Sequence, residues 1–271
     1  MKIIVSHDVD HLYPSDHIFR DLIFPKLWVR SSIEMLQGKI DFKTWFYRII
    51  SIFEYRMNRI PEIIEFDKKN EIPSTFFFGM DNLLGMSYKK EAAKPWIYFV
   101  KDKGFDVGVH GVDIDNVEKM EKEYKSFSEI SGMLNFGIRT HYVRYNETTF
   151  KKMAKIGYLF DSSEFNKTKI ELKSPYKIGE MWEFPLHIMD GYVMKNNLNE
   201  AKRNTISALE QASIKGIEYF TFLFHDYLFN PKTYPNDKAY YEWFISYCKE
   251  KQYSFISYKE AIEEINRHER Q

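Results

Sequence analysis

Short apolar runs rich in β-branched and aromatic residues alternate with longer amphipathic stretches along most of this chain. The runs predict strands at KIIVSH (2–7), STFFFG (74–79), DVGVH (106–110), FGIRTH (136–141), GYLFDS (157–162), MWEFPLHI (181–188), YFTFLFH (219–225) and YSFIS (253–257). Helical periodicity covers roughly 59–70, 88–103, 116–133, 147–156, 198–215, 236–250 and 258–267, with Asn116 and Asn146 as expected caps. Repeated strand-then-helix units favour a parallel sheet, and seven or eight of them predict an α/β fold, an irregular (β/α)7–8 barrel.

No sequence repeat, low-complexity tract or linker divides the chain, so residues 1–271 are expected to form a single domain. Residues 11–58 interrupt the alternation, because they contain no good strand and predict two amphipathic helices inserted after the first strand. Packing on the barrel rim is the ordinary reading of this insertion. The alternatives are an active-site lid or a basic, aromatic face that rests on a membrane.

The charge balance, the single cysteine and the lack of long apolar runs limit the expected partners and location of the protein. The 39 basic residues equal the 39 acidic ones, so nucleic acid is not an expected partner. The one cysteine, Cys248, lies on the apolar stripe of a predicted helix and is expected to be a buried structural thiol. The N-terminus predicts a strand rather than a signal peptide, and no apolar run approaches 18 residues, so a cytoplasmic location is expected.

The predicted strands end in ionisable side chains unusually often. In a β/α barrel the carboxyl ends of the strands meet on one face, where chemistry gathers. A single histidine at such a position is usually a satisfied hydrogen-bonding group, but several together are harder to explain that way. The side chains at or just after strand ends are His7, Asp8 and Asp10; His110; Arg139, His141 and Arg144; Asp161; and His225 and Asp226.

Aspartate and histidine are the usual ligands of Zn²⁺ and similar divalent ions, and a catalytic site keeps a position for water. Asp8 and Asp10 are two residues apart on a strand, so they share a face, and one can bind metal while the other stays free as a base. His7 and His11 alternate to the other face, where structural hydrogen bonding is the stronger expectation.

These motifs resemble those of the polysaccharide deacetylases, carbohydrate esterase family four, in a divergent form of the surface-polysaccharide biosynthesis type. SHDVDH resembles the first motif, VGVHG the second, RTHY the third and LFH the last, and GYLFDSS resembles the segment that follows the third. The resemblance runs from residue 2 to about 229, apart from the insertion. It implies that Asp8 is the base, Asp10 and His110 are metal ligands, Arg139 orients the base, Tyr142 supplies a backbone N–H to the oxyanion, and His225 is the general acid.

One ligand of the family pattern is missing, because Ile114 stands where a second histidine is usual. His141 replaces a proline of the third motif and is the expected third ligand, with Asp113 and Asp115 as the alternatives. Arg144 is the alternative to Arg139 for holding Asp8, and Asp161, Asp190 or Asp226 is expected to hold the imidazolium of His225.

The resemblance implies a metal-dependent hydrolase that removes an N-acetyl or related acyl group from a sugar. Zn²⁺ is the first choice of metal, with Co²⁺, Ni²⁺, Mn²⁺ or Fe²⁺ as alternatives. The expected partner is a carbohydrate, with lipid-linked and nucleotide-linked glycans as candidate forms. A catalytically silent sugar-binding relative and an amidohydrolase of small-molecule C–N bonds stay open. In the insertion, the aromatics Trp28, Trp45, Phe46 and Tyr47 are candidates to stack on sugar rings, and the arginines Arg30, Arg48 and Arg56 are candidates to meet a phosphate or carboxylate of the glycan. For most of these aromatics, packing on the barrel rim is the stronger expectation.

Overall fold

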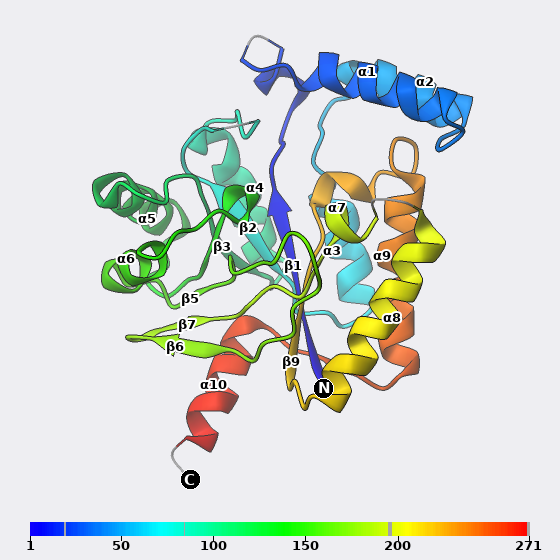
Figure 1. Ribbon diagram of the computed structural model, residues 1–271. Helices are drawn as coiled ribbons and strands as arrows, with labels where there is room; N and C mark the ends of the chain where they lie inside the picture. Colours follow the sequence, from blue (N-terminus) through cyan, green and yellow to red (C-terminus); the bar gives the residue numbers. More distant parts are fainter. Residues whose placement is uncertain (19, 84, 195–196, 270–271) are drawn as a thin grey trace.

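The computed structural model describes residues 1–18, 20–83, 85–194 and 197–269 (Figure 1). Its strands are β1 (Lys2–Val9), β2 (Thr75–Gly79), β3 (Asp106–Gly111), β4 (Ile138–Thr140), β5 (Phe160–Asp161), β6 (Tyr176–Ile178), β7 (Met181–Glu183), β8 (Ile188–Met189), β9 (Tyr219–Leu223) and β10 (Ser254–Phe255). Its α-helices are α1 (Ile23–Leu36), α2 (Phe42–Ile50), α3 (Ile60–Lys69), α4 (Lys90–Asp102), α5 (Val117–Ser131), α6 (Thr149–Ile156), α7 (Asp190–Val193), α8 (Leu198–Ile214), α9 (Pro235–Glu250) and α10 (Tyr258–His268).

One curled sheet forms the centre of the molecule, and helices pack around it (Figure 1). The strand order is β6-β7-β5-β4-β3-β2-β1-β9-β8, and β10 pairs with the first residues of β1. The pairs are parallel except for β6 with β7. No pairing among the described residues joins β6 to β8, so the barrel is open on that side. The predicted α/β barrel is therefore confirmed in its irregular form.

The central strands are covered on both faces, which explains their continuous apolar runs. Phe76, Phe77 and Phe78 of β2 are consecutive and have no exposed surface, although their side chains alternate between the two faces. Cys248 of α9 is also fully buried, as predicted from its place on the apolar stripe.

The predicted strand at 181–188 is wrong as one element. It splits into β7, which is second from one end of the strand order, and β8, which is at the other end. Pro185 lies between them and has no N–H to continue a ladder, so the chain leaves the sheet at Glu183 and re-enters it beside β9. The prediction also missed β6, whose partly exposed residues form a hairpin with β7 through Gly179 at φ +62°.

The predicted helices are confirmed within about two residues at their ends. Asn116 caps α5, because its side chain accepts a hydrogen bond from the N–H of Lys119. Helix α6 begins two residues later than predicted, with Thr148 as its cap. Asn146 instead accepts from the N–H groups of Thr148 and Thr149 just outside the helix.

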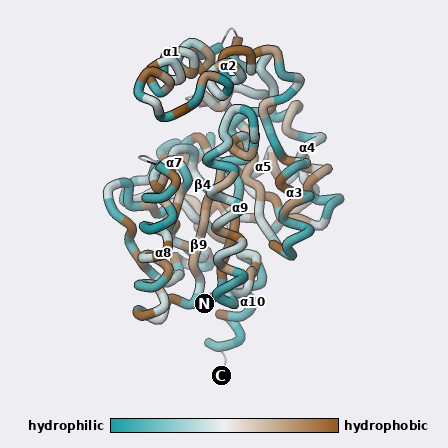
Figure 2. Tube along the Cα trace, turned by 90° about the vertical axis from the view of Figure 1, so that its right-hand side faces the viewer, coloured by the Kyte–Doolittle hydropathy of each residue, from teal (hydrophilic) through white to brown (hydrophobic). Residues whose placement is uncertain are grey.

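The insertion at 11–58 contains the two predicted helices, α1 and α2, which lie beyond the carboxyl end of β1 (Figures 1 and 2). Its two ends are tied together, because the carbonyl of Leu12 accepts hydrogen bonds from the N–H of Met57 at 2.9 Å and from Asn58 Nδ2 at 3.3 Å. Among the helices of the described residues, none combines the length and the apolar character that crossing a membrane requires. The organisation of residues 1–271 as a single domain stays a prediction.

Candidate metal and catalytic site

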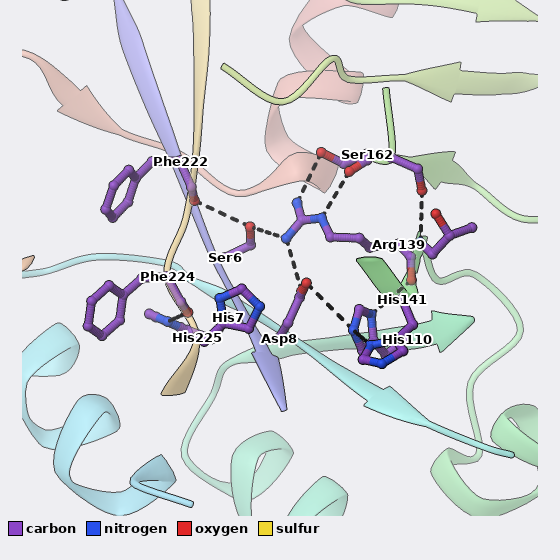
Figure 3. Close-up of polar contacts among 12 residues, drawn as sticks. Ser6, His7, Asp8, His110, Arg139, His141, Ser162, Phe222, Phe224 and His225 are labelled. Atoms are coloured by element: carbon purple, nitrogen blue, oxygen red, sulfur yellow. Dashed lines mark hydrogen bonds and ion pairs between the residues drawn. The ribbon is translucent and has the colours of Figure 1, made fainter. Parts of the chain in front are cut away.

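Neighbouring parallel strands bring the predicted site residues to one edge of the sheet. His110 ends β3 in register with Arg139 of β4, and β1 carries Asp8 to its carboxyl end beside β2. His141 follows β4 directly, and His225 comes two residues after β9. Figure 3 shows Asp8, Arg139, His110, His141 and His225 gathered around this edge.

Three donor atoms come together at one point. Asp10 Oδ1 lies 3.2 Å from His110 Nε2 and 3.3 Å from His141 Nδ1, and the two nitrogens are 3.1 Å apart. Ligands about 2.0–2.2 Å from a zinc ion in tetrahedral or octahedral arrangement are separated by about 3.0–3.4 Å. The spacing of Asp10, His110 and His141 therefore fits a single divalent ion.

The orientation of these groups also fits a metal. Asp10 Oδ1 is buried and, although two imidazole nitrogens are near, it has no hydrogen bond of acceptable geometry within the described part of the chain. The Nδ1–H of His110 donates to the carbonyl of Arg139 at 3.0 Å, which leaves the lone pair of Nε2 free to bind a metal. Burial opposes ionisation of Asp10, yet His141 and His110 hold the pKa of that carboxyl well below its usual range.

The two alternative ligands lie elsewhere. Asp113 Oδ1 accepts hydrogen bonds from the N–H groups of Asp115 and Asn116 and shapes the turn before α5. Asp115 Oδ1 accepts from Asn146 Nδ2 at 2.5 Å, and neither aspartate belongs to the metal-binding cluster found among the described residues. The structure thus places Asp113 and Asp115 away from this cluster and His141 within it, which favours His141 as the third ligand.

Asp8 lies beside the triad and is held by Arg139. Arg139 Nη1 donates to Asp8 Oδ1 at 3.1 Å, while Asp8 Oδ2 lies 3.7 Å from His110 Nε2. The guanidinium is completely buried over the ring of Phe77, with its centre 4.7 Å from the ring centroid. The remaining N–H groups of Arg139 are taken up by contacts that the sequence reasoning missed, namely Ser6 Oγ, Ser162 O, Ser162 Oγ and Tyr258 OH.

Arg144 does not hold Asp8, so that alternative is wrong. Its Nε donates to the carbonyl of His141 at 3.1 Å and its Nη2 to the carbonyl of Val112 at 2.6 Å. Arg144 therefore fixes the backbone that carries His141. Next to it, Tyr142 and Val143 have φ angles of +60° and +45°, a left-handed conformation that is costly for a β-branched residue. Tyr142 is 55% exposed and lines the cavity above the site.

His225 lies on the opposite side of Asp10 and is held by Asp190. Its Nδ1–H donates to the Asp190 carboxylate at 2.9 Å, and its backbone N–H donates to the same carboxylate at 2.5 Å. His225 Nε2 points to the site, 3.7 Å from Asp10 Oδ2. Burial lowers the pKa of His225, but the Asp190 carboxylate outweighs it and, with Asp10 and Asp8, raises that pKa to about 10.

The other two carboxylates predicted beside His225 do not contact its ring. Asp226 Oδ2 accepts from the N–H of Arg59 at 2.8 Å, and burial raises the pKa of Asp226 to about 8. Asp161 accepts from the Oγ–H and N–H of Ser163 and lies opposite the buried Glu183 of β7, whose carboxyl pKa is raised by burial and by Asp161. Of the three alternatives, Asp190 occupies the predicted position.

His7 and His11, which flank the two aspartates, lie on different sides of the strand end. His7 points away from the site, as expected, and bonds the carbonyl of Phe224 and Asp67 Oδ2 at 2.9 and 3.1 Å (Figure 3). For His11 the expectation is wrong, because it lines the same cavity as Asp10. Strand β1 ends at Val9, so the alternation of faces no longer applies at residue 11.

A cavity of about 1390 Å³ extends from the site to the insertion. Asp8, Asp10, His141 and His225 lie at one end, and residues of α1 and the segments around it form the opposite wall. The insertion is therefore a wall of the cavity.

The predicted side chains of the insertion are only partly right. Arg30 and Arg48 line the cavity, but Arg56 does not and instead pairs with Glu62 at 2.8 Å. The described lining contains none of the four predicted aromatics. The Nε1–H of Trp28 donates to the carbonyl of Ile49, and that of Trp45 donates to Ser32 Oγ, so both rings hold α1 against α2. These contacts agree with the stronger expectation, packing within the protein, for Trp28 and Trp45.

Comparison with known proteins gives a match in structure alone. No protein-family model matches the sequence, and no curated protein matches it. A candidate polysaccharide deacetylase from Mycobacterium smegmatis superposes with a TM-score of 0.62 at 14% identity, covering 99% of this chain and 91% of that one. The chain has the polysaccharide deacetylase fold. The resemblance seen in the motifs is thus confirmed at the level of the fold.

The polysaccharide deacetylase fold carries several functions. PuuE allantoinase superposes on this chain with a TM-score of 0.61 at 14% identity, covering 96% of this chain and 87% of that one. A wild-type pseudoenzyme of carbohydrate esterase family four from Bacillus anthracis has a TM-score of 0.51 at 8% identity, covering 96% and 64%. The fold alone therefore does not decide between these activities, and the site must be argued from its own geometry.

Proposed function

We propose that this protein is a metal-dependent hydrolase of the polysaccharide deacetylase family that removes an N-acetyl or related acyl group from a sugar. The observation that carries the proposal is the joint presence of the Asp10–His110–His141 triad, the Asp8–Arg139 pair and the His225–Asp190 pair at one end of the cavity. A ligand set alone would fit many metal proteins. Here the ligand set has Asp8, oriented by Arg139, on one side and His225, oriented by Asp190, on the other. A base and an acid next to a metal site are what hydrolysis requires.

Asp10, His110 and His141 would hold a divalent ion, which would supply Lewis-acid polarisation of the acyl carbonyl and a bound water of lowered pKa. Asp8 accepts a proton from the attacking water at Oδ2, because Oδ1 is held by Arg139. His225 donates a proton from Nε2 to the departing amine nitrogen, because its Nδ1–H is held by Asp190. Tyr142 lines the same cavity as His141, and the backbone near it is the proposed N–H donor to the oxyanion.

Two observations favour this function over its alternatives. The cavity of about 1390 Å³ exceeds the roughly 300–1000 Å³ of ordinary small-molecule pockets, which favours a glycan over a small ring amide. A silent relative has no need to keep a base, an acid and three ligands in matching orientation. Zn²⁺ is the proposed metal, with Co²⁺, Ni²⁺, Mn²⁺ and Fe²⁺ as alternatives. A role in surface-polysaccharide biosynthesis, a cytoplasmic location and membrane contact through residues 11–58 belong to the same proposal.

The test combines metal content with acetate release. The purified full chain is reconstituted with Zn²⁺, its metal is measured by elemental analysis, and acetate release is followed with N-acetyl-hexosamine oligosaccharides. We expect one metal per chain and acetate release that is lost in Asp8→Asn and kept in Asp113→Asn, which alters a carboxylate outside the cavity. A chain that binds no metal, or a metal-loaded chain that hydrolyses a small ring amide but no N-acyl sugar, would overturn the proposal.

A further inference from the structure

The wall that the insertion contributes to the cavity is strongly cationic. Among the described lining residues, the insertion supplies two acidic side chains, Asp21 and Glu34. It supplies five basic ones, which are Arg20, Lys26, Arg30, Lys39 and Arg48. The whole chain has a net charge of zero, so this excess is local to the cavity wall. Such a wall attracts an anionic group of a ligand.

Two of these cations have no partner among the residues that the structure describes. Glu34 is shared by Arg30 and Arg48, at 2.7 and 2.6 Å, and Arg20 Nη1 donates to the carbonyl of Ser87. For the ammonium groups of Lys26 and Lys39 the described structure contains no hydrogen bond and no ion pair. These two lysines are therefore available to neutralise a ligand charge.

An apolar groove continues from the cationic wall. It has a volume of about 560 Å³ and runs along α1, where Leu22, Pro25, Val29 and Ile33 line it. Leu22, Val29 and Ile33 are 63%, 62% and 49% exposed, and they are spaced to fall on one helix face. Lys26, Arg30 and Lys39 line both the groove and the cavity. With increasing distance from the metal-binding triad, the surface is thus first cationic and then apolar.

We propose that this face of α1 binds an amphiphilic glycan, with the phosphate or diphosphate of the sugar–lipid link on Lys26, Arg30 and Lys39 and the hydrocarbon chain in the groove. The inference rests on the proposed function, since it places the acylated sugar at the triad. The continuity of groove and cavity selects this ligand over a second protein copy, because a protein docked on the groove would account for neither the cations nor the cavity. Leu22, Val29 and Ile33 then bury surface that is otherwise left in water.

The first test measures binding without catalysis. Farnesyl diphosphate, farnesol and inorganic diphosphate are titrated by calorimetry into the metal-free full chain. We expect farnesyl diphosphate to bind most tightly. The double variant Lys26→Ala/Lys39→Ala weakens both diphosphates about tenfold, whereas Val29→Ser/Ile33→Ser weakens farnesyl diphosphate about tenfold and leaves inorganic diphosphate unchanged.

The chain offers matched controls on the same insertion. Lys43→Ala removes a cation of α2, and Leu36→Ser removes an apolar side chain of α1 that is 82% exposed, but neither residue lines the cavity or the groove. Both variants should bind farnesyl diphosphate like the unmodified chain. Equal losses in test and control variants, or dimerisation that Val29→Ser/Ile33→Ser abolishes while farnesyl diphosphate binding is unchanged, would overturn the inference.

The second test separates this inference from the proposed function. kcat/KM is measured on a neutral N-acetyl oligosaccharide, on the same sugar as a nucleoside diphosphate ester and on the same sugar as a prenyl diphosphate ester. We expect the prenyl ester to be preferred, and Lys26→Ala/Lys39→Ala to remove about tenfold from both esters while the neutral sugar is unaffected. Hydrolysis of all three at equal rates overturns the lipid subsite alone. Binding of farnesyl diphosphate without hydrolysis of any N-acyl sugar overturns the proposed function alone.

Discussion

The carboxylate of Asp190 bonds both the backbone N–H and the imidazole Nδ1–H of His225. One buried carboxylate therefore fixes the position, the tautomer and the charge of the imidazole at once. Asp190 is 1% exposed, so this interaction is little screened by water.

The first prediction concerns the pH dependence that Asp190 sets. The pKa of His225 is raised to about 10, and a general acid must be protonated to act, so activity is lost as the pH rises through that pKa. Asp190→Asn removes the charge that raises it. We expect the alkaline limb of the kcat/KM profile to move to lower pH by about one unit or more. An unchanged limb would mean that another group sets it.

The second prediction concerns the metal ligands. His141→Ala removes one of three donors that lie 3.1–3.3 Å from one another, so bound metal measured by elemental analysis should fall strongly. Asp113→Asn is the matched control, because the Asp113 carboxylate bonds the turn before α5 and the neighbouring Lys119 and is not part of the triad. Circular dichroism should show both variants folded. Full metal occupancy in His141→Ala would remove His141 from the ligand set.

The third prediction separates the roles of Asp8, near the end of β1, and Asp10, just after it. Asp8→Asn and His225→Ala should each lower kcat by about 10²-fold or more, because each removes a proton-transfer group. Both variants should keep nearly all of the metal, since neither residue belongs to the triad. Loss of metal in Asp8→Asn, with metal kept in Asp10→Asn, would show that the two roles are exchanged.

The fourth prediction concerns stability in acid. His187 is buried and neutral, because its Nδ1 accepts from the N–H of Thr221 and its Nε2–H donates to the carbonyl of Lys173, each at 3.0 Å. Burial lowers the pKa of His187 to about 4, below the roughly 6.5 of an unfolded histidine. The stabilising contribution is therefore complete above pH 6.5 and is lost as the pH falls toward 4. By linkage the loss amounts to about 3 kcal/mol.

Denaturant unfolding at pH 7.5 and pH 4.5 measures this loss. His187→Asn should be less stable than the unmodified chain at pH 7.5 but should lose less free energy of unfolding on acidification. His268→Asn, at an exposed position near the end of α10, is the control and should behave like the unmodified chain. An identical acid dependence in all three proteins would contradict the assignment.

The sequence predicted the edge of the sheet where the site lies, because strand ends are marked by where apolar runs stop. His141 could be singled out as a candidate ligand because it replaces a proline of the family pattern, which supplies no imidazole. The partner of His225 was not decided, because Asp190 follows β8, and only the strand order places β8 beside β9. Pro185 could have shown that the apolar run at 181–188 does not form one strand, because proline has no N–H to donate to the ladder.

The insertion was predicted as two helices, but the roles of its side chains were largely missed. Amphipathic spacing says that Trp28 and Trp45 share an apolar face with other residues, yet it does not say which surface that face meets. In the structure this face packs at the interface of α1 with α2. Lysine and arginine side chains of the insertion line the cavity instead. Lys26 and Lys39 could not be singled out, because exposed lysines are common on any helix surface.

The carbonyl of Leu12, two residues after Asp10, holds the two ends of the insertion side by side. Residues 13–56 therefore leave and rejoin the barrel at nearly the same point, so a shorter or longer segment could take their place without moving β1. The triad, the base and the acid all lie outside this segment. The residues proposed to carry out the reaction and those proposed to select the substrate thus lie in separate segments of the chain. Exchange of the insertion could then change the substrate without changing the reaction.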